Sequence, residues 1–171
     1  MTRPHATGER LYEKHRDALA QAHAACRTRG YFSLFSETPD RHPGGPDAQA
    51  SALAAFRAQL GGSFELDQPG TRGRLPGEVS PYTGEPLGID YPLADADALF
   101  VAAREAMRDW AQVSPEARVG VCMEIVDRLY AQVFVAQHAV MHTAGQSALM
   151  SYAGSGTNAL DRGVEALCYA H

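Results

Sequence analysis

The run of residues 79–110 constrains the fold of this chain more than any other stretch. It opens with Val-Ser-Pro-Tyr-Thr-Gly-Glu-Pro, in which Pro81 presets φ and Gly84 tolerates a positive φ, so a tight turn is predicted. Residues 87–91 then alternate between apolar and small or polar side chains and end before Pro92. This alternation is typical of a short, half-buried strand, and the run therefore predicts one strand of a β-hairpin.

A helix is predicted directly after this strand, from Asp95 to Trp110. The carboxylate of Asp95 can accept a hydrogen bond from a free backbone N–H group of the first turn. The apolar residues of the segment share one face, opposite the charged ones. That face comprises Leu99, Ala102, Ala103, Ala106, Met107 and Trp110. We expect this face to lie on another part of the protein.

Further helices are predicted on both sides of this run, at residues 8–29, 48–60, 115–144 and 157–170. Gly30 should end the first helix in a left-handed conformation, and the Ser114-Pro115 pair should start the third. A break is expected at Gly154-Ser-Gly156. The buried stripe expected between residues 115 and 130 consists of Val121 or Cys122, Ile125, Val126 and Leu129.

Two regions are expected in a chain that is mostly α-helical with a short β-hairpin. Residues 1–77 would form a helical extension that ends in a linker, because residues 63–77 are rich in glycine, proline and charge and read as a surface connection. Residues 78–171 would hold the hairpin and the helices that follow it. No internal repeat is present.

Composition limits the possible partners. A net charge of −5 with 20% charged and 45% hydrophobic residues gives no electrostatic basis for binding nucleic acid or an anionic membrane. The beginning of the sequence lacks the apolar core of a signal peptide, and no stretch approaches the roughly 20 apolar residues of a membrane span, so a cytoplasmic location is expected. The three cysteines are far apart, which disfavours a disulfide framework.

Several motifs resemble the opening of the aldehyde dehydrogenase superfamily. They are Pro81, Thr83, Gly84 and Glu85, then the alanine-rich helix that ends at Trp110, then Glu116 and Arg118 in the next helix. Ser80 stands where the superfamily usually has asparagine, and Ala117 separates the glutamate from the arginine. Three further strings, around residues 118–129, 139–146 and 160–170, together with a long N-terminal extension, are similar to the phenylacetic acid degradation branch.

The resemblance implies the N-terminal portion of an α/β fold, without its nucleotide-binding parallel sheet and catalytic domain. Its members oxidise an aldehyde with NAD or NADP by means of a cysteine nucleophile, a glutamate base and an asparagine that holds the oxyanion. In this branch the implied substrate is a ring-opened, CoA-linked semialdehyde from phenylacetate breakdown. The implied partner is the remainder of the enzyme, in the same or a separate chain, or a second copy.

None of the catalytic motifs of that family is found in this sequence. The asparagine belongs to a Pro-Trp-Asn segment, but Trp110 is the single tryptophan and lies in Asp-Trp-Ala. Gly145-Gln-Ser-Ala148 imitates the nucleophile motif with alanine in place of cysteine. Gln59-Leu-Gly-Gly62 imitates the motif of the base with an amide in place of the acid. We therefore assign no catalytic, cofactor-binding or metal-binding residue to this chain and expect it to be inactive alone.

The other candidate residues have ordinary structural explanations. Cys26, Cys122 and Cys168 are expected to be buried, unreactive thiols. His138 and His142 have the i, i+4 spacing of a helical zinc pair, but Ala139 replaces the general base and a third ligand is not evident. The Gly154-x-Gly156 string follows no predicted strand and lacks the third glycine of a dinucleotide motif.

Two alternatives to the dehydrogenase segment remain. The predicted helices could bury their apolar stripes against one another and form an independent helical interaction or assembly module. A helical metal-dependent hydrolase that uses His138 and His142 is the other alternative, and it would require a bound zinc ion.

Overall fold

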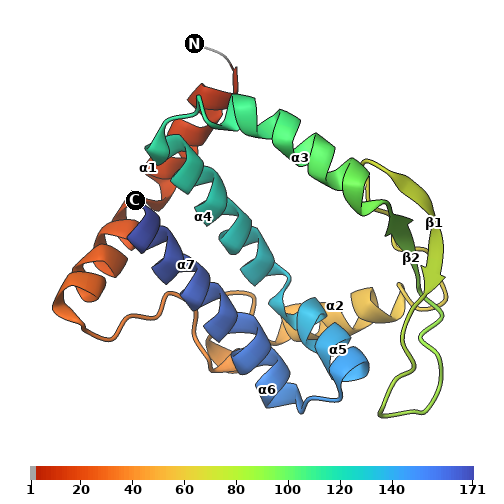
Figure 1. The fold of residues 1–171 in the computed structure, drawn as a ribbon. Coiled ribbons are helices and arrows are strands. Elements are labelled where there is room, and N and C mark those ends of the chain that lie inside the picture. Colours follow the sequence, from red (N-terminus) through yellow and green to blue (C-terminus); the bar gives the residue numbers. More distant parts are fainter. Residues whose placement is uncertain (1–2) are drawn as a thin grey trace.

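The computed structural model describes residues 3–171. Most of these residues are helical, with one antiparallel pair of strands (Figure 1). The elements are α1 (Arg3–Thr28), the short 3₁₀ helix η1 (Pro39–Arg41), α2 (Gly45–Arg57), β1 (Thr71–Pro76), β2 (Asp90–Ala94), α3 (Ala96–Trp110), α4 (Pro115–Ala131), α5 (Val133–Ala144), α6 (Ala148–Tyr152), the π turn η2 (Ala153–Thr157) and α7 (Asn158–Ala170). The predicted fold class, mostly α with a two-stranded hairpin, is confirmed.

The helices form two hydrophobic cores. The first lies among α1, α4 and α7, with the segment after α1 closing one side, and its buried residues are Leu19, Ala22, Phe35, Val119, Met123, Val164 and Cys168. The second lies among α2, α5 and α6, and its buried residues are Ala52, Val133, Phe134 and Tyr152. Tyr130 packs against both cores, so the two groups of helices share one body.

The local signals at Asp95, Ser114 and Gly84 are confirmed, whereas the first two helices begin earlier than predicted, at Arg3 instead of residue 8 and at Gly45 instead of residue 48. Asp95 accepts a hydrogen bond from the Ala98 N–H at 3.1 Å, and Ser114 accepts one from the Ala117 N–H at 3.2 Å. Gly84 has a φ of 73°, and its N–H donates to the Ser80 carbonyl at 2.8 Å, which closes the predicted turn. These contacts join residues at most four positions apart, so the sequence alone specifies them.

The hairpin differs from its prediction in position. Most of the expected strand at residues 87–91 lies outside the sheet, where Gly88 has a φ of 67°, and β2 instead begins at Asp90 and contains Pro92. Pro92 lies opposite Arg74 of β1. In a two-stranded sheet every strand is an edge, so a proline can face outward without losing a ladder hydrogen bond. Residues 63–77 lie at the surface as predicted, and all of β1 is exposed, but the segment also supplies a strand of the hairpin, which was not predicted.

Three predictions about the helices were also wrong. The chain does not break at Gly154-Ser-Gly156 but continues through one π turn into α7. At the end of α1 the left-handed residue is Arg29, with a φ of 54°, while Gly30 N–H donates to the Ala25 carbonyl. On α4 the buried residues are Ala117, Val119, Gly120 and Met123 rather than the predicted stripe. This face is the small one, and Gly8 of α1 packs directly against Ala117.

Helices from both sides of residue 77 share each core. α1 packs mainly on α4, and α2 packs on α5. Residues on the two sides of the proposed boundary at residues 77 and 78 thus contribute to common cores. The boundary itself stays a prediction.

α3 is the exception to this packing. It runs from the hairpin to the beginning of α4, away from the rest of the helical body (Figure 1). Among the described residues no other helix or strand packs on it beyond slight contact, and none of its residues is buried. None of the described helices combines the length and apolar character needed to cross a membrane.

Candidate functional site

The strings that imitate catalytic motifs serve as helix ends. Gly145 adopts a φ of 70° and ends α5, and Ser147 accepts a hydrogen bond from the Met150 N–H as the N-cap of α6. The string at Gln59 forms the turn after α2, where the Gly61 N–H donates to the Leu87 carbonyl at 2.9 Å. Both strings therefore have a complete structural explanation.

His138 and His142 point together, as their spacing predicts, but toward an aromatic ring. They stack on Phe56 with ring centroids 5.9 and 5.1 Å away, and Nδ1 of His142 lies 2.8 Å from the Ser80 hydroxyl. Burial, together with the neighbouring His142 and Arg57, lowers the pKa of His138. The two rings thus hold α2, α5 and the turn at Ser80 together.

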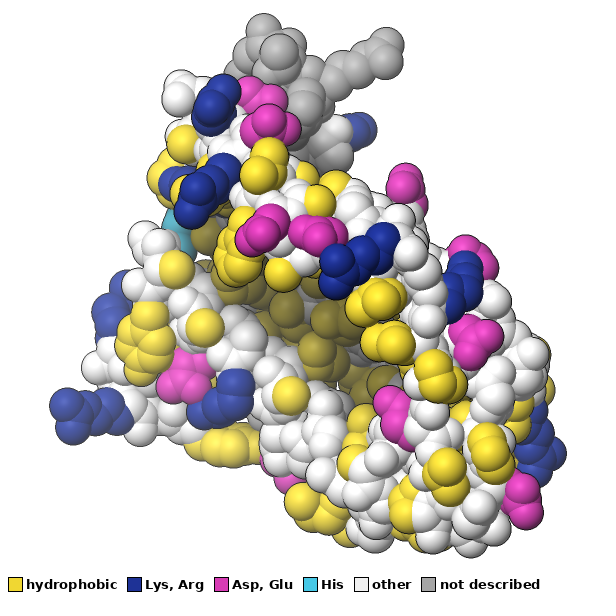
Figure 2. All heavy atoms as spheres, turned by 45° about the vertical axis from the view of Figure 1, so that its right-hand side comes forward, with side chains coloured by type: hydrophobic (Ala, Val, Ile, Leu, Met, Phe, Trp, Pro, Cys, Tyr) yellow, Lys and Arg dark blue, Asp and Glu magenta, His cyan; other side chains and the backbone are white. Residues whose placement is uncertain are grey.

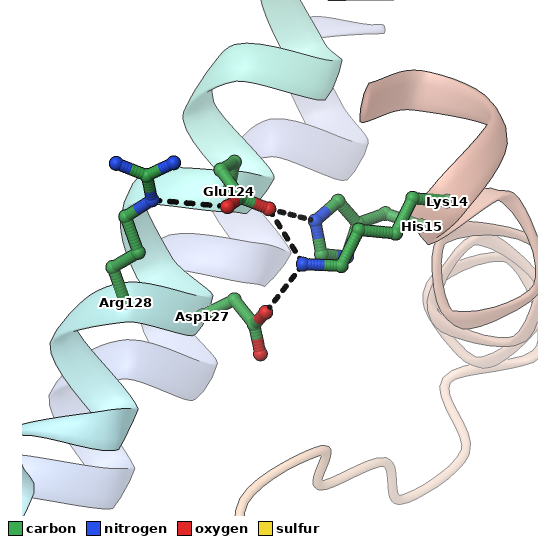
Figure 3. Close-up of polar contacts among 5 residues, drawn as sticks. All are labelled: Lys14, His15, Glu124, Asp127 and Arg128. Atoms are coloured by element: carbon green, nitrogen blue, oxygen red, sulfur yellow. Dashed lines mark hydrogen bonds and ion pairs between the residues drawn. The ribbon is translucent and has the colours of Figure 1, made fainter. Parts of the chain in front are cut away.

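The polar cluster between α1 and α4 was not predicted from the sequence. Figure 3 shows Lys14 and His15 of α1 facing Glu124, Asp127 and Arg128 of α4. Lys14 Nζ lies 2.7 Å from Glu124 and 2.9 Å from Asp127, while His15 Nε2 lies 3.1 Å from Glu124. Because these pairs span more than 100 positions, no local pattern marks them. We call this group of five residues the ionic clamp.

The electrostatics of the ionic clamp favour a structural role. Lys14, Arg128 and His15 lower the pKa of Glu124 to about 2, and the two carboxylates in turn raise the pKa of Lys14. The oxygen and nitrogen atoms of His15, Glu124 and Asp127 lie close enough together to hold a metal ion. The Lys14 ammonium already contacts both carboxylates, however, so a cation would have to displace it.

The cysteines do not form a reactive site. Cys168 is buried, and burial together with the neighbouring Cys26 raises the pKa of its thiol to about 11, so it stays protonated at neutral pH. Cys26 and Cys122 are half-buried. A thiolate nucleophile needs a lowered pKa, and Cys168 has the opposite.

A cavity of about 530 Å³ lies between the end of α1, residues 30–32 and α7. Most of its charged groups are engaged within the chain. Asp161 accepts hydrogen bonds from Ser33 and from the backbone of Leu34 and Phe35, and Arg162 is paired with Glu165. The cavity therefore presents no convergent set of free polar groups to a ligand.

The described residues do not match the geometry of a dinucleotide site. Such a site needs parallel strands followed by a glycine-rich turn at a helix N-terminus. The two strands of the described residues are antiparallel, and Gly154 and Gly156 lie in the π turn between two helices. We therefore assign no step of cofactor chemistry to these residues.

The feature that lacks an explanation within the chain is an uncovered apolar surface. Phe100 and Met107 of α3 are 65% and 64% exposed, and Trp110 is also exposed. On α4, Ile125 and Leu129 of the predicted buried stripe are 52% and 53% exposed. We call these five residues the outer apolar face. Figure 2 shows a hollow on the side that carries α3, with hydrophobic side chains across its floor and charged side chains along its rim.

The outer apolar face lies on two well-formed helices. Five large apolar side chains on two helices are left in water, although each helix begins at a well-formed N-cap. Large exposed apolar side chains, where they gather into a patch, mark places where another protein surface binds.

Comparison with known proteins identifies a similar solved structure. The chain matches the crystal structure of an NAD-dependent aldehyde dehydrogenase from Burkholderia multivorans, with 43% sequence identity and a TM-score of 0.87 over 93% of this chain. Its fold is that of part of an aldehyde dehydrogenase. The chain spans only 28% of the length of that relative. No protein-family model and no curated protein matched the chain.

Most of the solved relative lies outside the matched segment. The resemblance noted on the turn, the alanine-rich helix and the following helix is supported at the level of aldehyde dehydrogenases.

Proposed function

We propose that this chain is the N-terminal scaffold segment of an NAD(P)-dependent aldehyde dehydrogenase and is catalytically incompetent alone. The outer apolar face carries this proposal, because it consists of large side chains on well-formed helices that nothing in the described residues covers. Its partner is the remainder of the enzyme, which supplies the nucleotide-binding sheet and the catalytic residues, in the same or a separate chain.

The similarity to an NAD-dependent enzyme supports the reaction class. In the proposed enzyme this segment holds neither coenzyme nor aldehyde. It stabilises the sheet by burying apolar area, at roughly 25 cal/mol for each Å² removed from water. Its contribution to catalysis is therefore indirect, through the stability and position of the coenzyme domain.

A chimera tests this function. This chain would replace the matched segment of the Burkholderia multivorans enzyme, and NAD-dependent oxidation of a simple aldehyde would be measured for the chimera and for the chain alone. We expect turnover by the chimera only. Turnover or tight dinucleotide binding by the isolated chain would refute the proposal, as would a chimera that fails to fold.

We further propose that the enzyme acts in phenylacetate breakdown, where it oxidises a ring-opened, CoA-linked semialdehyde to the acid. The sequence motifs of residues 118–129, 139–146 and 160–170 support this finer assignment. Disrupting the gene in its host should abolish growth on phenylacetate as sole carbon source and leave growth on acetate unchanged. Normal growth on phenylacetate would count against the pathway.

The two buried cores favour a second candidate, an independent helical assembly module. Met123, Tyr152 and Val164 are at most 1% exposed, so the chain has an interior of its own. A monomer that unfolds cooperatively and binds no hydrophobic dye would support the module. Dye binding or self-association through the outer apolar face would support the dehydrogenase segment.

A further inference from the structure

Arg118 is a charged residue in line with the uncovered apolar stripe of α4. Residues 118, 122, 125 and 129 have the spacing i, i+4, i+7 and i+11, which places them along one face of the helix. Cys122 in this row is half-buried, while Ile125 and Leu129 are about half exposed. We call these four residues the α4 row. A surface that covers Ile125 and Leu129 and continues along the same row would reach Arg118.

Arg118 has no side-chain partner among the described residues. The other arginine of α4, Arg128, is bound to Glu124, and those of β1, Arg72 and Arg74, are bound to Asp95 and Glu65. Arg118 makes no such ion pair, and the first six residues of the chain, Met-Thr-Arg-Pro-His-Ala, contain no acidic side chain. Arg118 is half-buried as a residue, and its guanidinium therefore depends on water for hydrogen bonds.

Covering the α4 row removes that water. A guanidinium remains charged at all ordinary pH values and carries five N–H donors in a fixed plane. Burying such a group without an opposite charge is costly, whereas a carboxylate can accept two parallel hydrogen bonds from it. A neutral apolar surface could cover Ile125 and Leu129 but would leave Arg118 uncompensated.

We infer that the surface which covers the α4 row presents a carboxylate to Arg118. This inference rests on the proposed function, in which the body of an aldehyde dehydrogenase is the covering surface. The ion pair fixes the register of docking, because apolar contact alone is non-directional and a bidentate pair is not. Arg118 is thus a positioning residue that selects the correct partner surface.

Two substitutions in the chimera test this inference. Arg118→Met keeps a long side chain and makes the α4 row fully apolar. If the covering surface has no carboxylate opposite residue 118, Arg118→Met should strengthen docking. If it has a carboxylate there, as inferred, Arg118→Met leaves that carboxylate buried and unpaired, and the temperature of half-inactivation should fall by about 4 °C or more. Arg118→Gln should lower the temperature of half-inactivation similarly, since a neutral amide cannot compensate the charge of the carboxylate.

The controls separate this role from a structural one. Arg104→Met, on the charged face of α3, should change the temperature of half-inactivation of the chimera by less than about 2 °C. Arg118→Met in the isolated chain should also change the melting temperature by less than about 2 °C, because Arg118 has no partner there.

Each other outcome overturns the inference in a recognisable way. An equal loss in the isolated chain would make Arg118 a structural residue of this segment. An unchanged Arg118→Met chimera would exclude a buried acceptor, and an unchanged Arg118→Gln chimera would make that acceptor neutral. A parent chimera that does not fold or turn over would refute the proposed function, and with it the inference.

Discussion

The hydroxyl of Ser80 and Nδ1 of His142 are hydrogen-bonded at 2.8 Å across 62 positions of sequence. Ser80 is 1% exposed, and the His142 ring also stacks on Phe56 of α2. The contact fixes the turn before the hairpin onto α5. By the resemblance in sequence, Ser80 stands where the aldehyde dehydrogenase superfamily usually has asparagine, and both side chains are polar.

Replacing Ser80 by alanine should destabilise the chain. The substitution leaves a polar atom of His142 without its partner in a largely buried site, which costs about 1–3 kcal/mol. Chemical denaturation measures the change in the free energy of unfolding. Ser155→Ala, which removes an exposed hydrogen bond to Gln146, should cost at most about 0.5 kcal/mol. Equal effects of the two substitutions would show that the Ser80 contact is weak.

The ionic clamp should make the stability of the fold fall at acidic pH. The pKa of Glu124 is about 2 in the folded chain and 4.5 when unperturbed, so the folded state favours the ionised form. Its contribution is fully present above pH 4.5 and is lost as pH falls toward 2. Melting temperatures across pH 2–7 should show a smaller acid loss for Glu124→Gln than for the parent chain. Glu9→Gln, outside the clamp, should preserve the slope of the parent.

Gly120 should tolerate no side chain. A Cβ there would lie 2.4 Å from the backbone nitrogen of Tyr12 and 2.5 Å from the Gly8 carbonyl oxygen, so α1 and α4 would have to separate. Gly120→Ala should cost about 1–3 kcal/mol or prevent folding. At Gly163 in α7, the atom nearest to an added Cβ, Cγ2 of Val126, is 3.7 Å away. Gly163→Ala should therefore stabilise the chain by roughly 0.5–1 kcal/mol. In chemical denaturation, changes of opposite sign in the free energy of unfolding for the two variants would confirm both predictions.

The outer apolar face should bind a hydrophobic dye in the isolated chain. Phe100→Ser and Met107→Gln together should reduce dye fluorescence with little change in melting temperature, because no residue of α3 is buried. Met150→Gln, on the exposed part of α6, serves as the matched control. A large loss of stability in the double variant would mean that α3 packs on the body after all.

The sequence was most informative where partners are close along the chain. The N-caps Asp95 and Ser114, and the turn that ends at Gly84, were each identified from residues within four positions. It was less informative for the strand, because Pro92 excludes a central strand but not an edge strand, and the number of strands was unknown. The ionic clamp between Lys14 and Glu124 had no sequence signal, because more than 100 residues separate its members.

For α4, the sequence identified an apolar stripe but not its environment. Ile125 and Leu129 form a regular row, so the pattern predicted burial, yet α1 and α7 pack on the neighbouring faces. The small residues Ala117 and Gly120 decide this, because they permit close approach of α1. The sequence therefore identified Ile125 and Leu129 as an apolar row, but its prediction that the row is buried within this chain was wrong.

By itself the sequence determined the type and most limits of the helices, the turn before the hairpin and the resemblance to aldehyde dehydrogenases. These depend on the conformational preferences of single residues and on hydrogen bonds within one or two turns. Only the tertiary structure decided which faces are buried, which charges are paired and which apolar residues remain in water. Those outcomes depend on which distant segments come into contact, and burial is a property of the assembled surfaces rather than of any one of them.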